Sequence, residues 1–92
     1  MNESKKQIFF CSTDSCYKCR LIKPLIKEEM QQHPNIEFRE VEDLEILKAI
    51  NVSVVPTVIA MKCEWEVERL EDLHPIKEYS RMIKDLSDND YD

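Results

Sequence analysis

Two cysteines three positions apart are the residues in this sequence whose spacing most directly indicates chemistry. Cys16 and Cys19 follow a short apolar run and precede a long helical pattern, so we expect them at the N-terminus of a helix. The unpaired N–H groups and the dipole of a helix N-terminus favour negative charge. Lys18 and Arg20 add positive charge nearby, whereas Asp14 opposes them. Thiols in such settings have pKa values of roughly 3.5–7.5 instead of about 8.5. We therefore predict that Cys16 is partly ionised at neutral pH and that Cys19, one turn deeper, acts second.

A cysteine pair with this spacing can also be half of a zinc site, or it can arise by chance. A structural zinc site needs four ligands, which often come as two close pairs. The remaining candidates form no second close pair; they are Cys11, Cys63, His33 and His74. We therefore expect no metal and favour redox chemistry, in which a thiolate exchanges with a disulfide.

Composition limits the classes of function. The 92 residues make one small domain, and an apolar content of 42% supports a single modest core. The net charge of −6 argues against nucleic acid or a membrane surface as the main partner. No apolar run reaches the ~20 residues of a membrane span, and the N-terminus lacks a secretory pattern, so we expect a cytoplasmic protein. Glycine is absent. This excludes the glycine-rich loops that hold nucleotides, and we expect no cofactor.

Hydrophobic periodicity predicts an order of strand, helix, strand, short helix, strand, strand, helix. The predicted strands cover residues 7–11, 36–41, 56–61 and 64–70, and the predicted helices cover residues 17–32, 44–50 and 75–86. The side chains expected to point inward from the helices are Leu21, Ile22, Leu25, Ile26, Met30, Leu44, Leu47, Ala49, Ile50, Ile76, Tyr79, Ile83 and Leu86. The last strand is expected at an edge of the sheet that Trp65 covers, after a hairpin turn at Lys62 and Cys63.

This order predicts an α/β fold. A parallel pair of strands joined by a helix, followed by an antiparallel hairpin, makes a four-stranded mixed sheet with helices on both faces. We expect one domain over residues 1–86 and a solvated acidic tail over residues 87–92.

The chain resembles the thioredoxin superfamily over about residues 7–86, at three places. The first is the Cys16–Cys19 pair at a strand-to-helix junction. The second is Pro24, five residues after the second cysteine, where thioredoxins have a proline that kinks the active-site helix. The third is Val55-Pro56-Thr57, which looks like the cis-proline loop of the family.

The resemblance implies a thioredoxin-like fold and a thiol–disulfide oxidoreductase that contributes to electron transfer and cell redox homeostasis. Cys16 and Cys19 would be the catalytic residues, and the substrate-binding residues would be Val55, Pro56, Tyr17 and Lys18. The implied partners are protein disulfides and a reductase or small-thiol electron donor, with the chain acting as a monomer. Two alternatives stay open: a thioredoxin-like binding module without redox activity, and glutathione-dependent activity of the glutaredoxin type.

Several positions depart from the family pattern. Ser15 replaces the tryptophan that usually precedes the first cysteine, and Phe10 stands where thioredoxins bury an aspartate that accepts a proton from the second thiol. Any acceptor here must be water or another carboxylate. Asp72 replaces a glycine of the partner-docking groove and, with Glu71, places negative charge there. The glycine pair that helps glutaredoxins hold glutathione is missing.

The two other cysteines are expected to have no redox role. Cys11 ends a buried strand and should behave as a small hydrophobic residue. Cys63 should be exposed in the hairpin turn. Because the first and third strands are predicted to be antiparallel, these two cysteines lie at opposite ends of the sheet and cannot form a disulfide, which requires Cα atoms within about 7 Å.

Overall fold

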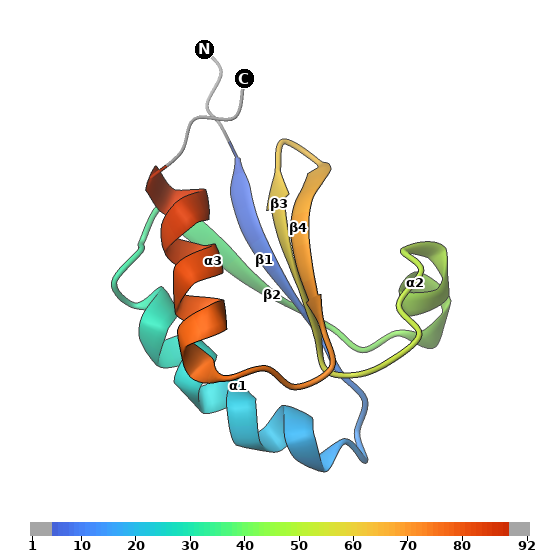
Figure 1. Cartoon of the computed structure of the whole chain (residues 1–92). Coiled ribbons are helices and arrows are strands. Elements are labelled where there is room, and N and C mark those ends of the chain that lie inside the picture. The colour runs from blue at the N-terminus through green and yellow to red at the C-terminus, as the bar shows by residue number, and fades with distance from the viewer. Residues whose placement is uncertain (1–4, 89–92) are drawn as a thin grey trace.

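The elements follow the predicted order in the computed structural model, which describes residues 5–88 (Figure 1). Their bounds are β1 Lys6–Cys11, α1 Tyr17–Met30, β2 Ile36–Val41, α2 Leu44–Ala49, β3 Thr57–Lys62, β4 Trp65–Glu71 and α3 Ile76–Asp88. Pro24 lies inside α1, as predicted. No helix in the described part of the chain is long and apolar enough to cross a membrane.

The strands form one mixed sheet in the order β2-β1-β3-β4. β1 pairs in parallel with β2 and antiparallel with β3, and β3 pairs antiparallel with the edge strand β4. In the central pair Cys11 lies opposite Thr57, and Lys6 lies opposite Lys62. This register confirms that Cys11 and Cys63 lie at opposite ends of the sheet, and both are free thiols.

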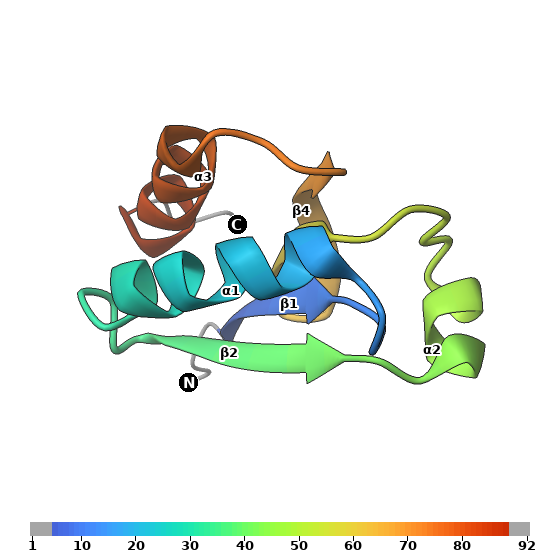
Figure 2. The ribbon, with the colours of Figure 1, turned by 90° about the horizontal axis from the view of Figure 1, so that it is seen from below.

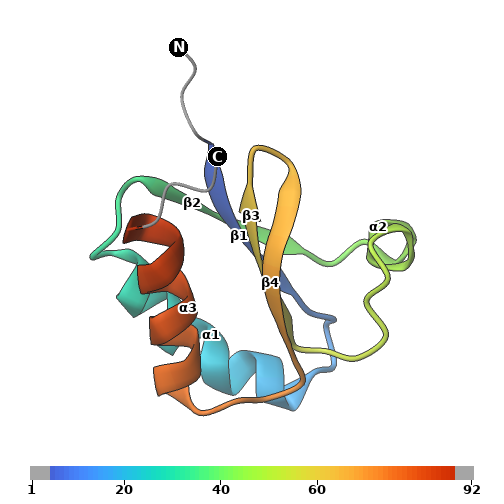
Figure 3. The same cartoon turned by 45° about the horizontal axis from the view of Figure 1, so that its top comes forward.

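α1 and α3 lie side by side on one face of the sheet (Figures 2 and 3). The main core fills the space between this face and the two helices. Its buried members come from every element except α2: Ile8, Phe10, Cys19, Ile22, Ile26, Met30, Ile36, Val58, Ala60, Leu70, Tyr79, Met82, Ile83 and Leu86. This core fixes α1, and with it the cysteine pair, against the sheet.

The opposite face carries a smaller core, which α2 alone covers among the helices of residues 5–88. Its buried members are Cys11, Leu47 and Ile59. The predicted sheet with helices on both faces is therefore confirmed. Burial raises the pKa of the Cys11 thiol from 9.0 to about 11, so this thiol stays protonated and packs as a small hydrophobic residue.

Five side chains predicted to point inward are instead exposed. Leu21 and Leu25 are 50% and 45% exposed, because the sheet contacts only the line of α1 that carries Cys19, Ile22, Ile26 and Met30. Ile76, at the start of α3, is 39% exposed. In α2 only Leu47 is buried, and both Leu44 and Ala49 are exposed because the short helix touches the sheet along a single turn.

The β3–β4 hairpin turn also differs from the prediction. β3 ends at Lys62 and pairs directly with Trp65, so the turn residues are Cys63 and Glu64. Both have positive φ, 50° and 71°, which is the pattern of the two-residue type I′ turn. Trp65 is 77% exposed and does not cover the sheet edge, because it is the first residue after the turn and lies beyond both cores.

The last helix runs two residues further than predicted. α3 ends at Asp88, so Ser87 belongs to the helix and not to a tail. The backbone carbonyl of Ser87 accepts a hydrogen bond from Lys6 Nζ at 2.9 Å, which ties the end of α3 to β1. Residues 89–92 of the predicted tail lie outside the described residues.

We predict that the double substitution Cys63→Asn with Glu64→Gly stabilises the protein. Left-handed backbone is unfavourable by about 1–2 kcal/mol for an ordinary residue, and Asn-Gly is the preferred type I′ sequence. The free energy of unfolding in urea should therefore rise by about 1 kcal/mol or more. The same Glu-to-Gly exchange at the helical position Glu45 should instead lower it by about 1 kcal/mol. No gain in the hairpin variant would contradict the turn assignment.

We predict that the buried Cys11 thiol makes the folded protein less stable in alkali. Between about pH 9 and pH 11 the unfolded chain releases this proton while the folded chain retains it. The free energy of unfolding should then fall as pH rises, by up to about 1.4 kcal/mol per pH unit. Urea titrations of wild type and Cys11→Ala across this range measure the difference. Parallel pH profiles for the two proteins would show that Cys11 is not the cause.

Candidate redox site

Cys16 lies at the junction between the first loop and α1. It is the N-cap, one residue before the first helical residue, with extended backbone at φ −82° and ψ 105°. Its Sγ accepts a hydrogen bond from the backbone N–H of Cys19 at 3.1 Å, and its own N–H donates to the carbonyl of Thr13 at 3.2 Å. A thiolate at this position accepts a hydrogen bond from a backbone N–H that would otherwise lack a partner. The helix N-terminus therefore stabilises negative charge on Cys16.

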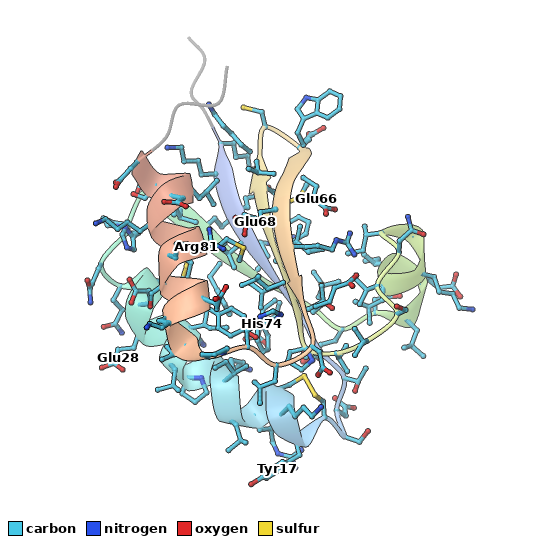
Figure 4. The ribbon with its side chains drawn as sticks, viewed as in Figure 1. Tyr17, Glu28, Glu66, Glu68, His74 and Arg81 are labelled. Atoms are coloured by element: carbon cyan, nitrogen blue, oxygen red, sulfur yellow. A yellow bond between two sulfur atoms is a disulfide. The ribbon has the colours of Figure 1, made fainter. Side chains whose placement is uncertain are left out.

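Cys16 and Cys19 form a disulfide in this structure (Figure 4). Their Cα atoms are 5.2 Å apart, within the usual range for a disulfide. Cys19 is 3% exposed and belongs to the main core, whereas Cys16 is only partly buried against it. The accessible sulfur is therefore that of Cys16, and Cys19 is shielded behind it.

The Val55-Pro56 segment lies at the same end of the sheet as this disulfide. The Val55-Pro56 peptide bond is cis, as the resemblance implied. Cys11 and Thr57 are paired residues on neighbouring strands, so the loop that leads to Cys16 and the loop that ends at Pro56 leave the sheet side by side. Val55 and Cys16 both pack against the main core. The predicted catalytic and substrate-binding segments are thus brought together.

A comparison with solved structures identifies this arrangement. Thioredoxin O2 from Arabidopsis thaliana, in its oxidized state, superposes with a TM-score of 0.83 over 91% of this chain and 76% of that chain, at 24% sequence identity. The chain has a thioredoxin fold. Mitochondrial thioredoxin 3 from Saccharomyces cerevisiae, in its oxidized form, gives a TM-score of 0.82 at 20% identity, with 91% and 81% covered.

Thioredoxin 1 from Thermosipho africanus gives a TM-score of 0.77 at 23% identity, over 85% of this chain and 90% of that chain. No protein-family model matches the sequence, and no curated protein matches it either. The likeness to the solved structures, at 20–24% sequence identity, establishes the fold alone.

Lys18 and Tyr17 occupy the two positions between the cysteines on the solvent side of this thioredoxin fold. Tyr17 is 66% exposed, and Figure 4 shows it at the start of α1 pointing away from the sheet. Lys18 Nζ lies 3.1 Å from Asp72 Oδ1, in an ion pair that joins α1 to the loop before α3. Hydrogen bonding from Lys18 lowers the pKa of the Asp72 carboxyl. The negative charge predicted at Asp72 is therefore present but paired.

Exposed apolar side chains adjoin these residues. Tyr17, Leu21 and Leu25 follow one another at helical spacing along α1, and all three are exposed. Leu73 is exposed directly after Asp72, which contacts α1 through Lys18. The side of the molecule that carries Cys16 thus presents apolar surface to the solvent.

A cavity of about 450 Å³ lies behind the disulfide, between α1 and the ends of β1 and β2. Cys19 lines it, together with Phe10, which is fully buried. Phe10 cannot accept a proton, so the lining carboxylates Asp14 and Glu42 and any water in this cavity are the available acceptors. The sequence could not reveal this cavity, because its lining residues come from three separate segments.

All six site residues predicted from the sequence lie at this end of the sheet, and their individual roles stay predictions. Sequence reasoning missed the partner of Lys18, because the 54 positions that separate it from Asp72 give no local signal. Within residues 5–88, no group of three or more Cys, His, Asp or Glu side chains could hold a metal ion.

We predict that Asp72→Asn increases the reactivity of Cys16. Removing the carboxylate leaves the Lys18 charge free to stabilise the thiolate, so alkylation of the reduced protein by iodoacetamide at pH 6–7 should accelerate by a factor of about two to five. The neighbouring substitution Glu71→Gln, which does not touch Lys18, is the control. The acceleration should shrink in 1 M salt. Equal rates for wild type and Asp72→Asn would show that Lys18 does not influence Cys16.

Proposed function

We propose that this protein is a thiol–disulfide oxidoreductase that reduces disulfides in other proteins. The observation that carries the proposal is the Cys16–Cys19 disulfide at the N-terminus of α1, at the same end of the sheet as the cis Val55-Pro56 bond. The thioredoxin fold supports it. A lone cysteine pair could be structural, but here one sulfur is accessible and the other is buried directly behind it.

The first step is nucleophilic attack by Cys16. In the reduced protein, the Cys16 thiolate attacks one sulfur of a substrate disulfide, forming a mixed disulfide and expelling the other substrate sulfur as a thiolate. The N–H of Cys19 that points to Cys16 Sγ stabilises the attacking anion. The exposed ammonium of Lys18 adds positive charge two residues away.

The second step resolves the mixed disulfide. Cys19 loses its proton to water or a carboxylate of the adjoining cavity and attacks Cys16 Sγ. The Cys16–substrate bond breaks, the second substrate thiolate leaves and is protonated, and the Cys16–Cys19 disulfide forms. The substrate has then gained two electrons and two protons, and the protein is in the oxidised form described above. A reductase or a small thiol returns it to the dithiol.

Substrate recognition is proposed for the segment before β3 and the start of α1. The backbone of Val55 would pair with an extended segment of the substrate, next to Pro56, and Tyr17 would contact it from the other side. The exposed apolar residues nearby suit a protein substrate. We propose that the chain acts as a monomer in a reducing compartment such as the cytoplasm, where substrate disulfides are reduced.

A second candidate is a thioredoxin-like binding module. The observation that favours it is Phe10, because the buried Cys19 thiol lies beside an aromatic ring instead of an acidic group. If proton transfer from Cys19 is slow, the disulfide would be a static crosslink. A redox titration in glutathione buffers separates the candidates, because only an active pair reaches equilibrium.

We predict that Cys16→Ser abolishes reduction of insulin with dithiothreitol as the recycling reductant. Cys19→Ser should instead accumulate a covalent mixed disulfide with substrate, detected by mass spectrometry, because the first step proceeds and the second cannot. Cys63→Ser is the matched control and should keep full activity, since this exposed thiol lies at the far end of the sheet. Wild-type activity no greater than that of Cys16→Ser would sink the proposal.

A further inference from the structure

Arg69 connects the edge strand to the segment that precedes the cis-proline. Its side chain leaves β4 on the face that α1 and α3 do not cover, beside Ile59 of the smaller core. The Nη2 atom donates to the carbonyl of Ile50 at 2.9 Å, and Nη1 donates to the carbonyl of Asn51 at 3.1 Å. Ile50 is the C-cap of α2, so Arg69 satisfies carbonyls that the end of this helix leaves unpaired.

The guanidinium is itself held in place. Nε and Nη2 donate to the two carboxylate oxygens of Glu66, each at 2.7 Å, and Glu71 lies 3.7 Å from Nη1. The side chain is only 19% exposed. A planar guanidinium can donate to a carboxylate and to two carbonyls at once, which a lysine ammonium cannot match in geometry. Arg69 is thus a fixed bridge between β4 and the end of α2.

The residues that Arg69 contacts have few other attachments to the sheet, whereas further along the segment Val55 packs against the main core and Pro56 is fully buried. α2 has six residues, too few to be stable alone, and it buries only Leu47. After it, Asn51 takes a left-handed conformation at φ 60°. Two hydrogen bonds that follow within the segment run from Val52 N–H to the Leu47 carbonyl and from Thr57 Oγ1 to the Val54 carbonyl. Neither of these bonds connects the segment to β4.

We propose that Arg69 is a positioning residue that fixes the end of α2 and thereby the start of the substrate-binding segment, residues 53–56, and this inference rests on the proposed function. Cys16 and Cys19 are held independently by β1 and α1, on the main core. Losing Arg69 therefore loosens the residues that lead from α2 into the substrate-binding segment and leaves the thiol chemistry in place. Binding of a protein substrate should weaken, whereas reaction with a small disulfide should not.

Arg81 of α3 provides a matched control, because it forms an ion pair with β4 on the face opposite to that of Arg69. Its guanidinium contacts both carboxylate oxygens of Glu68, at 2.6 and 3.4 Å, and also Asp85 at 3.2 Å. Figure 4 shows Arg81 beside Glu68 between α3 and β4, whereas Glu66 projects from the other side of β4. Arg81→Met removes a comparable ion pair without touching the segment before the cis-proline.

The test compares Arg69→Met, Arg69→Lys and Arg81→Met. We expect Arg69→Met to raise KM for insulin about tenfold, because the mutation weakens substrate binding without abolishing it. The kcat for insulin and the rate with the small disulfide DTNB should stay within about twofold of wild type. Arg69→Lys should recover little of the lost insulin binding, because one ammonium cannot replace the several directed N–H donors of the planar guanidinium. Arg81→Met should leave KM unchanged.

A second measurement does not depend on activity. Amide hydrogen exchange over residues 44–56 should accelerate in Arg69→Met and not in Arg81→Met. If Arg69→Met does not fold, Glu66→Gln, which releases one side of the guanidinium, should show the same KM rise and faster exchange to a smaller degree. An unchanged KM, an equal loss with DTNB, or an equal KM rise in Arg81→Met would overturn the inference. Failure of the proposed function is distinguishable, because wild type itself would then be inactive in both assays.

Discussion

The antiparallel pairing of β1 with β3 in the centre of the sheet is the constraint on which the rest of the site depends. It places the carboxyl end of one strand beside the amino end of the other, with Cys11 opposite Thr57. The loop that delivers Cys16 and the loop that carries Pro56 therefore leave the sheet as neighbours. A shift of this register by one residue would move the core side chains to the wrong face, so burial of Ile8 and Phe10 also fixes the site.

The two faces of the sheet are stabilised by different means. One face carries two packed helices and most of the buried apolar area, which holds Cys19 rigidly behind Cys16. The other face has a short helix with one buried residue, Leu47, and relies on the polar bridge from Arg69. Cys16, the proposed nucleophile, therefore lies on the well-packed side, whereas the residues that lead into the proposed substrate-binding segment depend on the lightly packed side. Local opening is expected first on the lightly packed side.

The lack of glycine explains where the backbone is least favourable. Because there is no glycine, each residue with positive φ carries a side chain. Four residues of the described chain have positive φ, and two of them, Asn51 and Asp72, are of the types that tolerate it best. Both make a long-range contact: the Asn51 carbonyl accepts a hydrogen bond from Arg69, and Asp72 pairs with Lys18 beside the cysteine pair. The other two form the hairpin turn at the far end of the sheet, where side-chain chemistry offers no such compensation.

The order of elements, the strand core and the position of Cys16 at a helix N-terminus followed from the sequence alone, because periodicity and short spacings are local properties. The cis state of the bond before Pro56 followed only from the family resemblance. Which apolar residues of α1 are buried depended on the tertiary structure, since Ile26 faces the sheet and Leu25 does not. The ion pair of Lys18 and the carbonyl contacts of Arg69 depended on it too. These contacts join residues far apart in the chain, and only strand register and helix packing decide which of them meet.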